Sequence, residues 1–174
     1  MIFKFLFLIY FCLLQIFCFS NNLNLKKGKD SNTESLIISE NNNRLITENG
    51  YLELNMVYNK NNENFNLDFI YFDQDWFFFD STKNFMFLFS DSNYQILQSK
   101  GKITYSGDGE SIYFKAKGKI HIPTDFLNKI IDQKIYGLRI NGKYKFKEYK
   151  IGIDKMQKRW KNMIYDLRKN NISL

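Results

Sequence analysis

Three aspartates and a single histidine are the side chains of this 174-residue sequence best suited to acid–base or metal chemistry. Asp73, Asp75 and Asp80 flank an aromatic run, and His121 lies between two isoleucines. Paired carboxylates can hydrolyse glycosidic bonds or bind calcium. However, Asp73 and Asp75 lack the further Asp or Asn and the Gly of a calcium loop, and no G-x-S-x-G motif supplies a nucleophile for His121. We therefore assign no catalytic residue and no metal ligand, and we keep an envelope hydrolase that uses Asp73, Asp75 or His121 as an alternative.

The run Trp76–Phe79 is apolar throughout, which is typical of a central strand with both faces covered. Within a strand, Phe77 and Phe79 point to the opposite side from Trp76 and Phe78. Two interpretations follow. Either one set lies on an exposed face, where aromatic rings stack on sugars or anchor protein partners, or both sets are covered and the C-terminal helix covers the outer one.

Three lysines form a basic row, because Lys143, Lys145 and Lys147 alternate with Tyr144 and Phe146 along one strand. A surface of lysines and aromatic rings can bind nucleic acid. Export makes a protein or glycan partner outside the cytoplasm the better prediction. The predicted contact surface consists of Trp76, Phe77, Phe79, Lys143, Lys145 and Lys147.

The elements that position these side chains are short strands, which begin at Gly50. Predicted strands cover residues 51–58, 65–72, 76–79, 85–89, 94–97, 102–105, 111–117, 119–122, 134–140 and 143–153. A Thr124 cap predicts a short helix to about Asp132, and Asn141-Gly142 predicts a two-residue type I′ turn. The sequence thus predicts a β-rich fold, all-β or α+β, built as an antiparallel sandwich or a partly open barrel.

A longer amphipathic helix is predicted over residues 154–169, with Asp154 as its cap. Its apolar stripe consists of Met156, Trp160, Met163, Ile164 and Leu167, and lysines and arginines surround that stripe. We expect the stripe to dock on the sheet and to cover its apolar face. A basic amphipathic helix that lies weakly on an anionic membrane surface is the alternative.

The first twenty residues have the pattern of a signal peptide. Lys4 provides a short charged region, residues 5–14 are uninterrupted apolar residues, and Cys18 and Ser20 occupy the −3 and −1 positions of a cleavage site. A membrane anchor needs about 20 apolar residues, which is more than this stretch supplies. Retention of the leader as an anchor and lipidation of Cys18 are the alternatives.

The exported chain would contain no cysteine, because Cys12 and Cys18 both lie in the leader. This excludes disulfides, a thiol nucleophile and cysteine-based metal sites, so a hydrophobic core must supply the stability. Loss of Lys4 lowers the formal net charge from +7 to +6, which permits anionic partners without requiring one. Residues 21–48 are polar and lack periodicity, which predicts a flexible tether before a single β-rich domain over residues 49–174.

The sequence as a whole predicts an exported, non-enzymatic binding or structural module of the periplasm, cell surface or extracellular space. The run Ser106–Glu110 contains two glycines but no Walker lysine, so we interpret it as a turn and predict no cofactor.

We expect N-terminal sequencing of the exported protein to begin at Asn21, because cleavage after Ser20 fits the pattern of small residues. An intact-mass measurement of the same protein would detect a lipid on Cys18. A mature chain that starts with a modified Cys18, or that retains Met1, would contradict this prediction.

Overall fold

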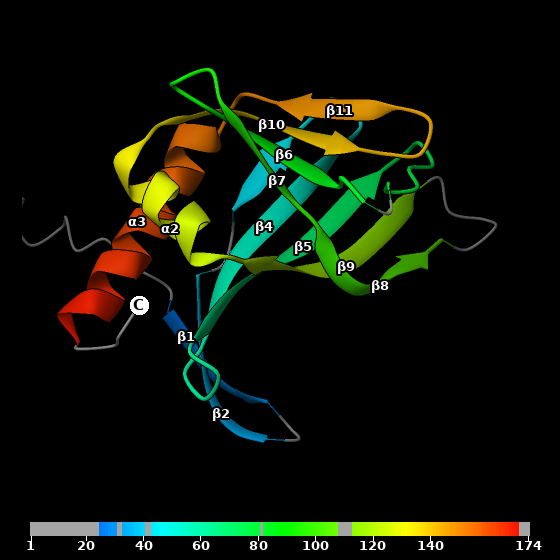
Figure 1. The fold of residues 1–174 in the computed structure, drawn as a ribbon. Coiled ribbons are helices and arrows are strands. Elements are labelled where there is room, and N and C mark those ends of the chain that lie inside the picture. Colours follow the sequence, from blue (N-terminus) through cyan, green and yellow to red (C-terminus); the bar gives the residue numbers. More distant parts are fainter. Residues whose placement is uncertain (1–24, 31–32, 41–42, 81, 108–112, 171–174) are drawn as a thin grey trace, which may run out of the picture.

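Two ten-residue strands, β4 (Gly50–Asn59) and β5 (Asn64–Asp73), form the central hairpin of the computed structural model (Figure 1). The structure describes residues 25–30, 33–40, 43–80, 82–107 and 113–170. Buried and half-buried residues alternate along β5, and β4 follows the same period less regularly because Glu53 and Val57 are buried too, so one face of the hairpin is buried and the other is partly open.

The first sheet grows outward from this hairpin. β9 (Phe114–Ile122) pairs with β5 over nine positions, and β8 (Ser99–Ser106) pairs with β9. On the other side, β4 pairs with β2 (Thr33–Glu40) and with the short β3 (Arg44–Ile46), and β1 (Leu25–Asp30) pairs with β2. All these pairs are antiparallel, as the sequence predicts for this fold class.

The second sheet lies over the first and has the order β11-β10-β6-β7. Its strands are β6 (Phe85–Phe89), β7 (Tyr94–Leu97), β10 (Ile135–Asn141) and β11 (Phe146–Tyr149). Gln98 alone separates β7 from β8, so the chain passes directly from one sheet to the other. The described residues therefore form a sandwich-like, strand-rich fold, which confirms the predicted fold class.

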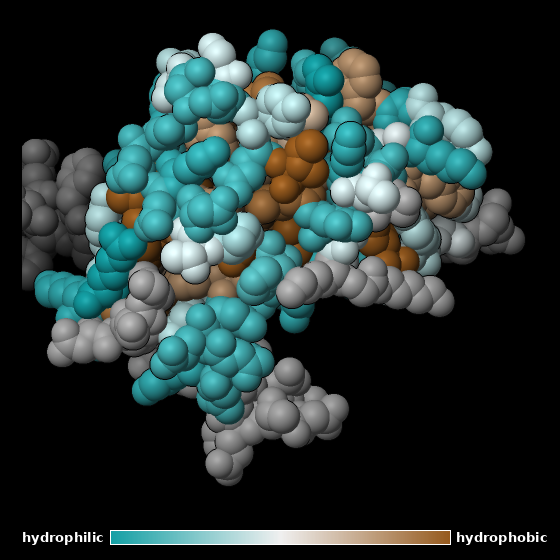
Figure 2. Space-filling view, viewed as in Figure 1, coloured by the Kyte–Doolittle hydropathy of each residue, from teal (hydrophilic) through white to brown (hydrophobic). Residues whose placement is uncertain are grey.

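Aromatic rings fill the space between the sheets. Phe69 of the first sheet contacts Phe85 of the second, with ring centroids 5.0 Å apart. On the outside of the second sheet, Met86, Leu88 and Ile96 are half-buried, and Figure 2 shows an apolar strip over β6 and β7. Most of the remaining surface in that view is hydrophilic.

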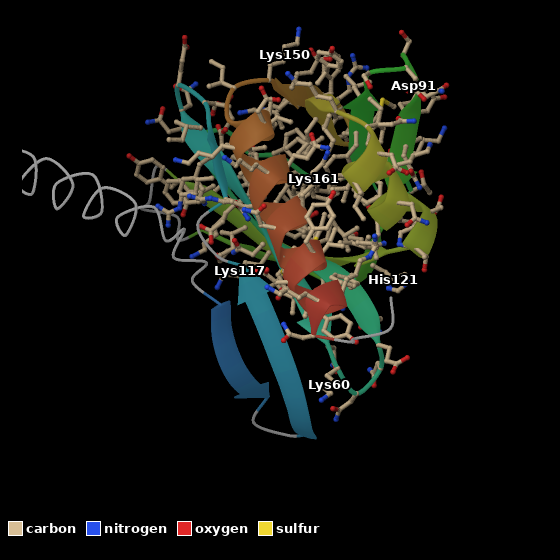
Figure 3. All side chains as sticks on the ribbon, turned by 90° about the vertical axis from the view of Figure 1, so that its left-hand side faces the viewer. Lys60, Asp91, Lys117, His121, Lys150 and Lys161 are labelled. Atoms are coloured by element: carbon tan, nitrogen blue, oxygen red, sulfur yellow. The ribbon has the colours of Figure 1, made fainter. Side chains whose placement is uncertain are left out.

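Two helices close one end of the sandwich, α2 (Thr124–Asp132) and α3 (Ile153–Lys169) (Figures 1 and 3). The apolar stripe predicted for the C-terminal helix is buried in the core, which confirms its docking: Met156, Trp160, Met163, Ile164 and Leu167.

The predicted helix caps are wrong in both helices. α2 begins after Pro123 rather than Thr124, and α3 begins after Gly152, whose φ of 85° is available to glycine. Neither cap residue has a side chain that accepts a hydrogen bond from an N–H of its helix. Asp154 lies in the first turn of α3, where it pairs with Lys134 at 3.3 Å.

A buried glutamine ties α3 to α2, an interaction that the sequence did not reveal. The Nε2 of Gln157 donates to the carbonyl of Ile130 at 2.8 Å, and its Oε1 accepts from the N–H of Ile135 at 2.9 Å. Lys161, labelled in Figure 3, donates to the carbonyl of Ile131 at 2.7 Å. These side chains satisfy carbonyls at the end of α2 that have no partner within their own helix.

The structure differs from the predicted tether over residues 21–48. Residues 21–24, 31–32 and 41–42 lie outside the described residues, but β1, β2 and β3 fall in the same range. Leu45 of β3 is 1% exposed and packs in the core. The polar composition of this range did not predict strands. Backbone hydrogen bonds pair these strands whatever their side chains, and one buried leucine, Leu45, produces no periodic pattern.

The last hairpin is present, but its predicted two-residue turn is wrong. Asn141 pairs with Phe146, so four residues connect β10 to β11, and the φ of Gly142 is not positive. Glycine is required there for close packing instead. A Cβ on Gly142 would lie 2.9 Å from the carbonyl oxygens of Phe78 and Lys145.

We expect Trp160→Ala to lower the free energy of unfolding by about 3–5 kcal/mol, because this fully buried ring would leave a cavity. Urea denaturation measures the change. Tyr165→Ala is the matched control, since Tyr165 lies on the exposed side of the same helix. Equal stability of the two variants would contradict the docked position of α3.

Candidate functional site

The segment Trp76–Phe79 is extended but is not the central strand that the sequence predicts. It lies beside the β10–β11 connection, where the N–H of Lys143 donates to the carbonyl of Phe78 at 2.8 Å. The N–H of Asp80 donates to the carbonyl of Asn141 at 2.9 Å, and Phe79 forms an isolated bridge with Gly142. Few backbone hydrogen bonds therefore hold the segment, so its side chains must fix its position.

Phe77 and Phe79 provide that anchorage, because both point into the core. Phe77 contacts Tyr71 with ring centroids 5.1 Å apart, and Phe79 contacts Phe69 at 5.2 Å and Phe85 at 5.6 Å. The prediction that Phe77 and Phe79 belong to the contact surface is therefore wrong, since neither ring is available to a partner.

The alternate residues point outward and form an exposed aromatic surface, defined here as Trp76, Phe78 and Tyr105. Their exposed fractions are 61%, 46% and 38%. The rings of Trp76 and Phe78 are nearly parallel, with an interplanar angle of 18° and centroids 5.9 Å apart. Each ring of this surface contacts the buried ring of Phe114, at 5.0 to 5.9 Å.

Tyr105 also fixes the position of the segment, because its hydroxyl accepts a hydrogen bond from the N–H of Phe79 at 3.3 Å. Of these three residues, only Trp76 belongs to the contact surface predicted from the sequence. The alternation of side chains along residues 76–79 does place Phe78 on the same side as Trp76. Tyr105 comes from β8 and had no signal linking it to the segment.

The three predicted lysines have different surroundings. Lys143 is exposed and its Nζ lies 5.2 Å from the ring centroid of Tyr144. Lys145 pairs with Asp75 at 3.6 Å, next to Trp76 in the chain. The structure therefore places Lys143 and Lys145 in the β10–β11 loop, beside the aromatic surface, but it directs Lys147 elsewhere.

Lys147 forms a buried ion pair with Asp73, which joins β11 of one sheet to β5 of the other. The side chain of Asp73 is 1% exposed and also accepts the N–H of Asp75 at 2.9 Å. Burial by itself raises the pKa of Asp73, but the hydrogen bonds and the positive charge of Lys147 hold this pKa below its usual range. The prediction that Lys147 lies on the contact surface is wrong for this reason.

Two tyrosines border the ion pair. Burial, together with the negative charge of Asp73, raises the pKa of Tyr71 and of Tyr149. Both phenols therefore stay neutral, and the pair of Asp73 and Lys147 carries the charges of this cluster. Such a cluster ties the sheets together and exposes no reactive group.

The residues of the hydrolase alternative do not come together. Asp73 is opposite Phe114 in the sheet and His121 is opposite Asn66, a separation of seven residues along β5. At about 3.3 Å per residue, His121 lies roughly 23 Å from the acids. Asp80, the third acid near the aromatic run, accepts hydrogen bonds from the N–H groups of Thr82 and Lys83, as a turn residue does.

Comparisons with known proteins do not add a function. No protein-family model matches the chain, and neither a curated protein nor a solved structure gives a significant match. Within the described residues, no group of three or more His, Cys, Asp or Glu side chains is arranged to hold a metal ion. None of the described helices is long and apolar enough to span a membrane.

We expect Asp73→Asn to lower the free energy of unfolding at pH 7 by up to about 3–5 kcal/mol, because the half-buried ammonium of Lys147 would lose its partner. Since the folded-state pKa of Asp73 lies below the unfolded value of about 3.9, its contribution is present above that value. The contribution disappears as the pH falls through the folded pKa. Urea denaturation between pH 7 and pH 2 should therefore show a weaker acid destabilisation in Asp73→Asn than in the wild type.

Asp75→Asn provides the matched control for this measurement. Its partner Lys145 is exposed, so the loss should stay below about 1 kcal/mol. Identical losses and pH profiles for the two variants would show that the ion pair of Asp73 and Lys147 does not hold the sheets together.

Proposed function

We propose that this protein is an exported, non-enzymatic binding module that holds a glycan on its aromatic surface. The observation that supports the proposal best is the display of Trp76 and Phe78 beside each other, with their rings nearly parallel. Leaving such rings in water costs about 25 cal/mol for each Å² of apolar surface. A ligand that covers them recovers this free energy.

The surroundings of the aromatic surface favour a sugar. The C–H face of a sugar ring packs against an aromatic ring, and polar groups at the edge can bind its hydroxyls. Lys143, Lys145 and Asp75 supply such groups from the adjacent loop and turn. The contact with buried Phe114 keeps the rings in place before binding, which reduces the entropy lost when the ligand binds.

The proposal that the chain is exported rests on the sequence of the leader, which lies outside the described residues. Lys4, the apolar run and the small residues at positions 18 and 20 support it. Glycans are abundant outside the cytoplasm, so the proposed location and ligand are consistent with each other.

The two other functions considered above have weaker support. The hydrolase lacks convergent side chains, because His121 is far from Asp73 and Asp75. Membrane association through α3 would have to rely on its basic side alone, since the apolar stripe is buried in the core.

A glycan array, probed with the folded chain, tests the proposed function. We expect binding to neutral glycans, and an affinity loss for them of at least about tenfold, or 1.4 kcal/mol, in Trp76→Ala and in Phe78→Ala. Tyr94→Ala is the matched control, because Tyr94 is equally exposed but lies in the second sheet. Absence of any binding to neutral glycans, or full binding of them by a folded Trp76→Ala variant, would refute the proposal.

A further inference from the structure

The outer face of the first sheet carries a second basic row, in addition to the predicted row of Lys143, Lys145 and Lys147. Alternate residues of β9 point away from the core, and all of them are basic: Lys115, Lys117, Lys119 and His121. On the neighbouring β5 they are opposite Phe72, Ile70, Asp68 and Asn66. The row runs along β9, and in Figure 3 Lys117 lies to one side of α3 and His121 to the other.

The middle of this row borders a hollow of about 390 Å³ between β5, β8 and β9. Its lining includes the side chains of Asp68, Ile70, Thr104, Lys117 and Lys119. The hollow thus combines two ammonium groups, one carboxylate, one hydroxyl and one apolar side chain. The Nζ of Lys119 lies 3.8 Å from Asp68, and Lys117 forms no ion pair with any described residue.

Aromatic rings at one end of the row help to define the class of ligand. Tyr51, Phe72 and Tyr113 stack on one another, with centroids 5.3 and 4.6 Å apart, and Arg44 lies 4.7 Å above Tyr51. At least one face of each ring is therefore covered by a neighbour. Single-stranded nucleic acid needs free ring faces on which its bases can stack, and this stacking reduces the faces on offer.

We propose that this hollow binds a sugar unit that carries a carboxylate or sulfate group, as part of an acidic polysaccharide. The anionic group would pair with Lys117 and Lys119, and a sugar hydroxyl would donate a hydrogen bond to Asp68. Ile70 would contact the apolar face of the ring, and Thr104 can donate or accept another hydrogen bond. Lysines two residues apart on a strand are about 6.6 Å apart, so Lys115 can contact the next unit.

Removal of Asp68 distinguishes binding of a sugar from a general attraction of anions to the lysines. For a bare polyanion or an anionic lipid surface, the negative charge of Asp68 is unfavourable, and its removal should strengthen binding. For a sugar that donates a hydroxyl to Asp68, removal of the carboxylate should weaken binding. The two ligand classes therefore predict changes of opposite sign.

The experiment measures binding of a heparin oligosaccharide, a sulfated uronic-acid polymer, to the full folded chain by titration calorimetry at physiological salt. We expect the double variant Lys117→Gln/Lys119→Gln to lose at least tenfold in affinity, and Asp68→Ala to lose severalfold. Lys155→Gln/Lys158→Gln removes the same charge from the exposed side of α3, and it should bind as the wild type does. Neutral dextran should not compete for the site.

Further measurements distinguish this site from the aromatic surface, and the proposed ligand from other anions. Trp76→Ala should bind heparin normally, so failure of the glycan proposal above would leave this one intact. Equal losses in the two lysine double variants, or tighter binding by Asp68→Ala, would overturn the proposal. Stronger binding to a single-stranded oligonucleotide or to phosphatidylserine vesicles than to heparin, with the same sensitivity to Lys117 and Lys119, would also overturn it.

Discussion

Packing of Phe77 and Phe79 between the two sheets is the constraint on which the candidate site depends. These rings contact Tyr71, Phe69 and Phe85, which belong to both sheets, and so they fix an extended segment that has few backbone hydrogen bonds of its own. Since side chains alternate along an extended chain, anchoring one pair of rings forces the other pair outward. The exposure of Trp76 and Phe78 is thus a direct consequence of core packing.

The described residues contain no cysteine, so no disulfide joins them, and polar contacts stabilise the places where apolar packing ends. Asp73 and Lys147 join the sheets beside the aromatic segment, and Gln157 joins the two helices at the other end. Asp73 and Gln157 are buried and Lys147 is half-buried, so each would be costly to leave without its partner. Such contacts restrict how the sheets and helices can be arranged, and this keeps the surface rings in fixed positions.

Sequence patterns predicted the parts of the fold that depend on local alternation. The strands of the β4–β5 hairpin and the stripe of α3 follow from such periods, and both are confirmed. Patterns failed where a distant residue decides the outcome. Lys147 looked like a member of an exposed row until its partner, 74 residues away, was known, and Gly142 is required by the nearby Phe78 carbonyl rather than by a turn type. The basic row of β9 was equally visible in the sequence, but only the register with β5 shows which side chains border it.

Fluorescence of the two tryptophans gives the most direct test of the central claim, because one is displayed and the other is fully buried. In Trp160→Phe, Trp76 is the sole tryptophan, and in Trp76→Phe the sole tryptophan is Trp160. The packing of Phe77 and Phe79 predicts that acrylamide quenches Trp76 readily and Trp160 hardly at all. It further predicts that Phe77→Ala, by loosening the anchor, changes the quenching of Trp76. Protection of Trp76 from acrylamide in the folded, ligand-free protein would contradict the exposed aromatic surface and the function proposed for it.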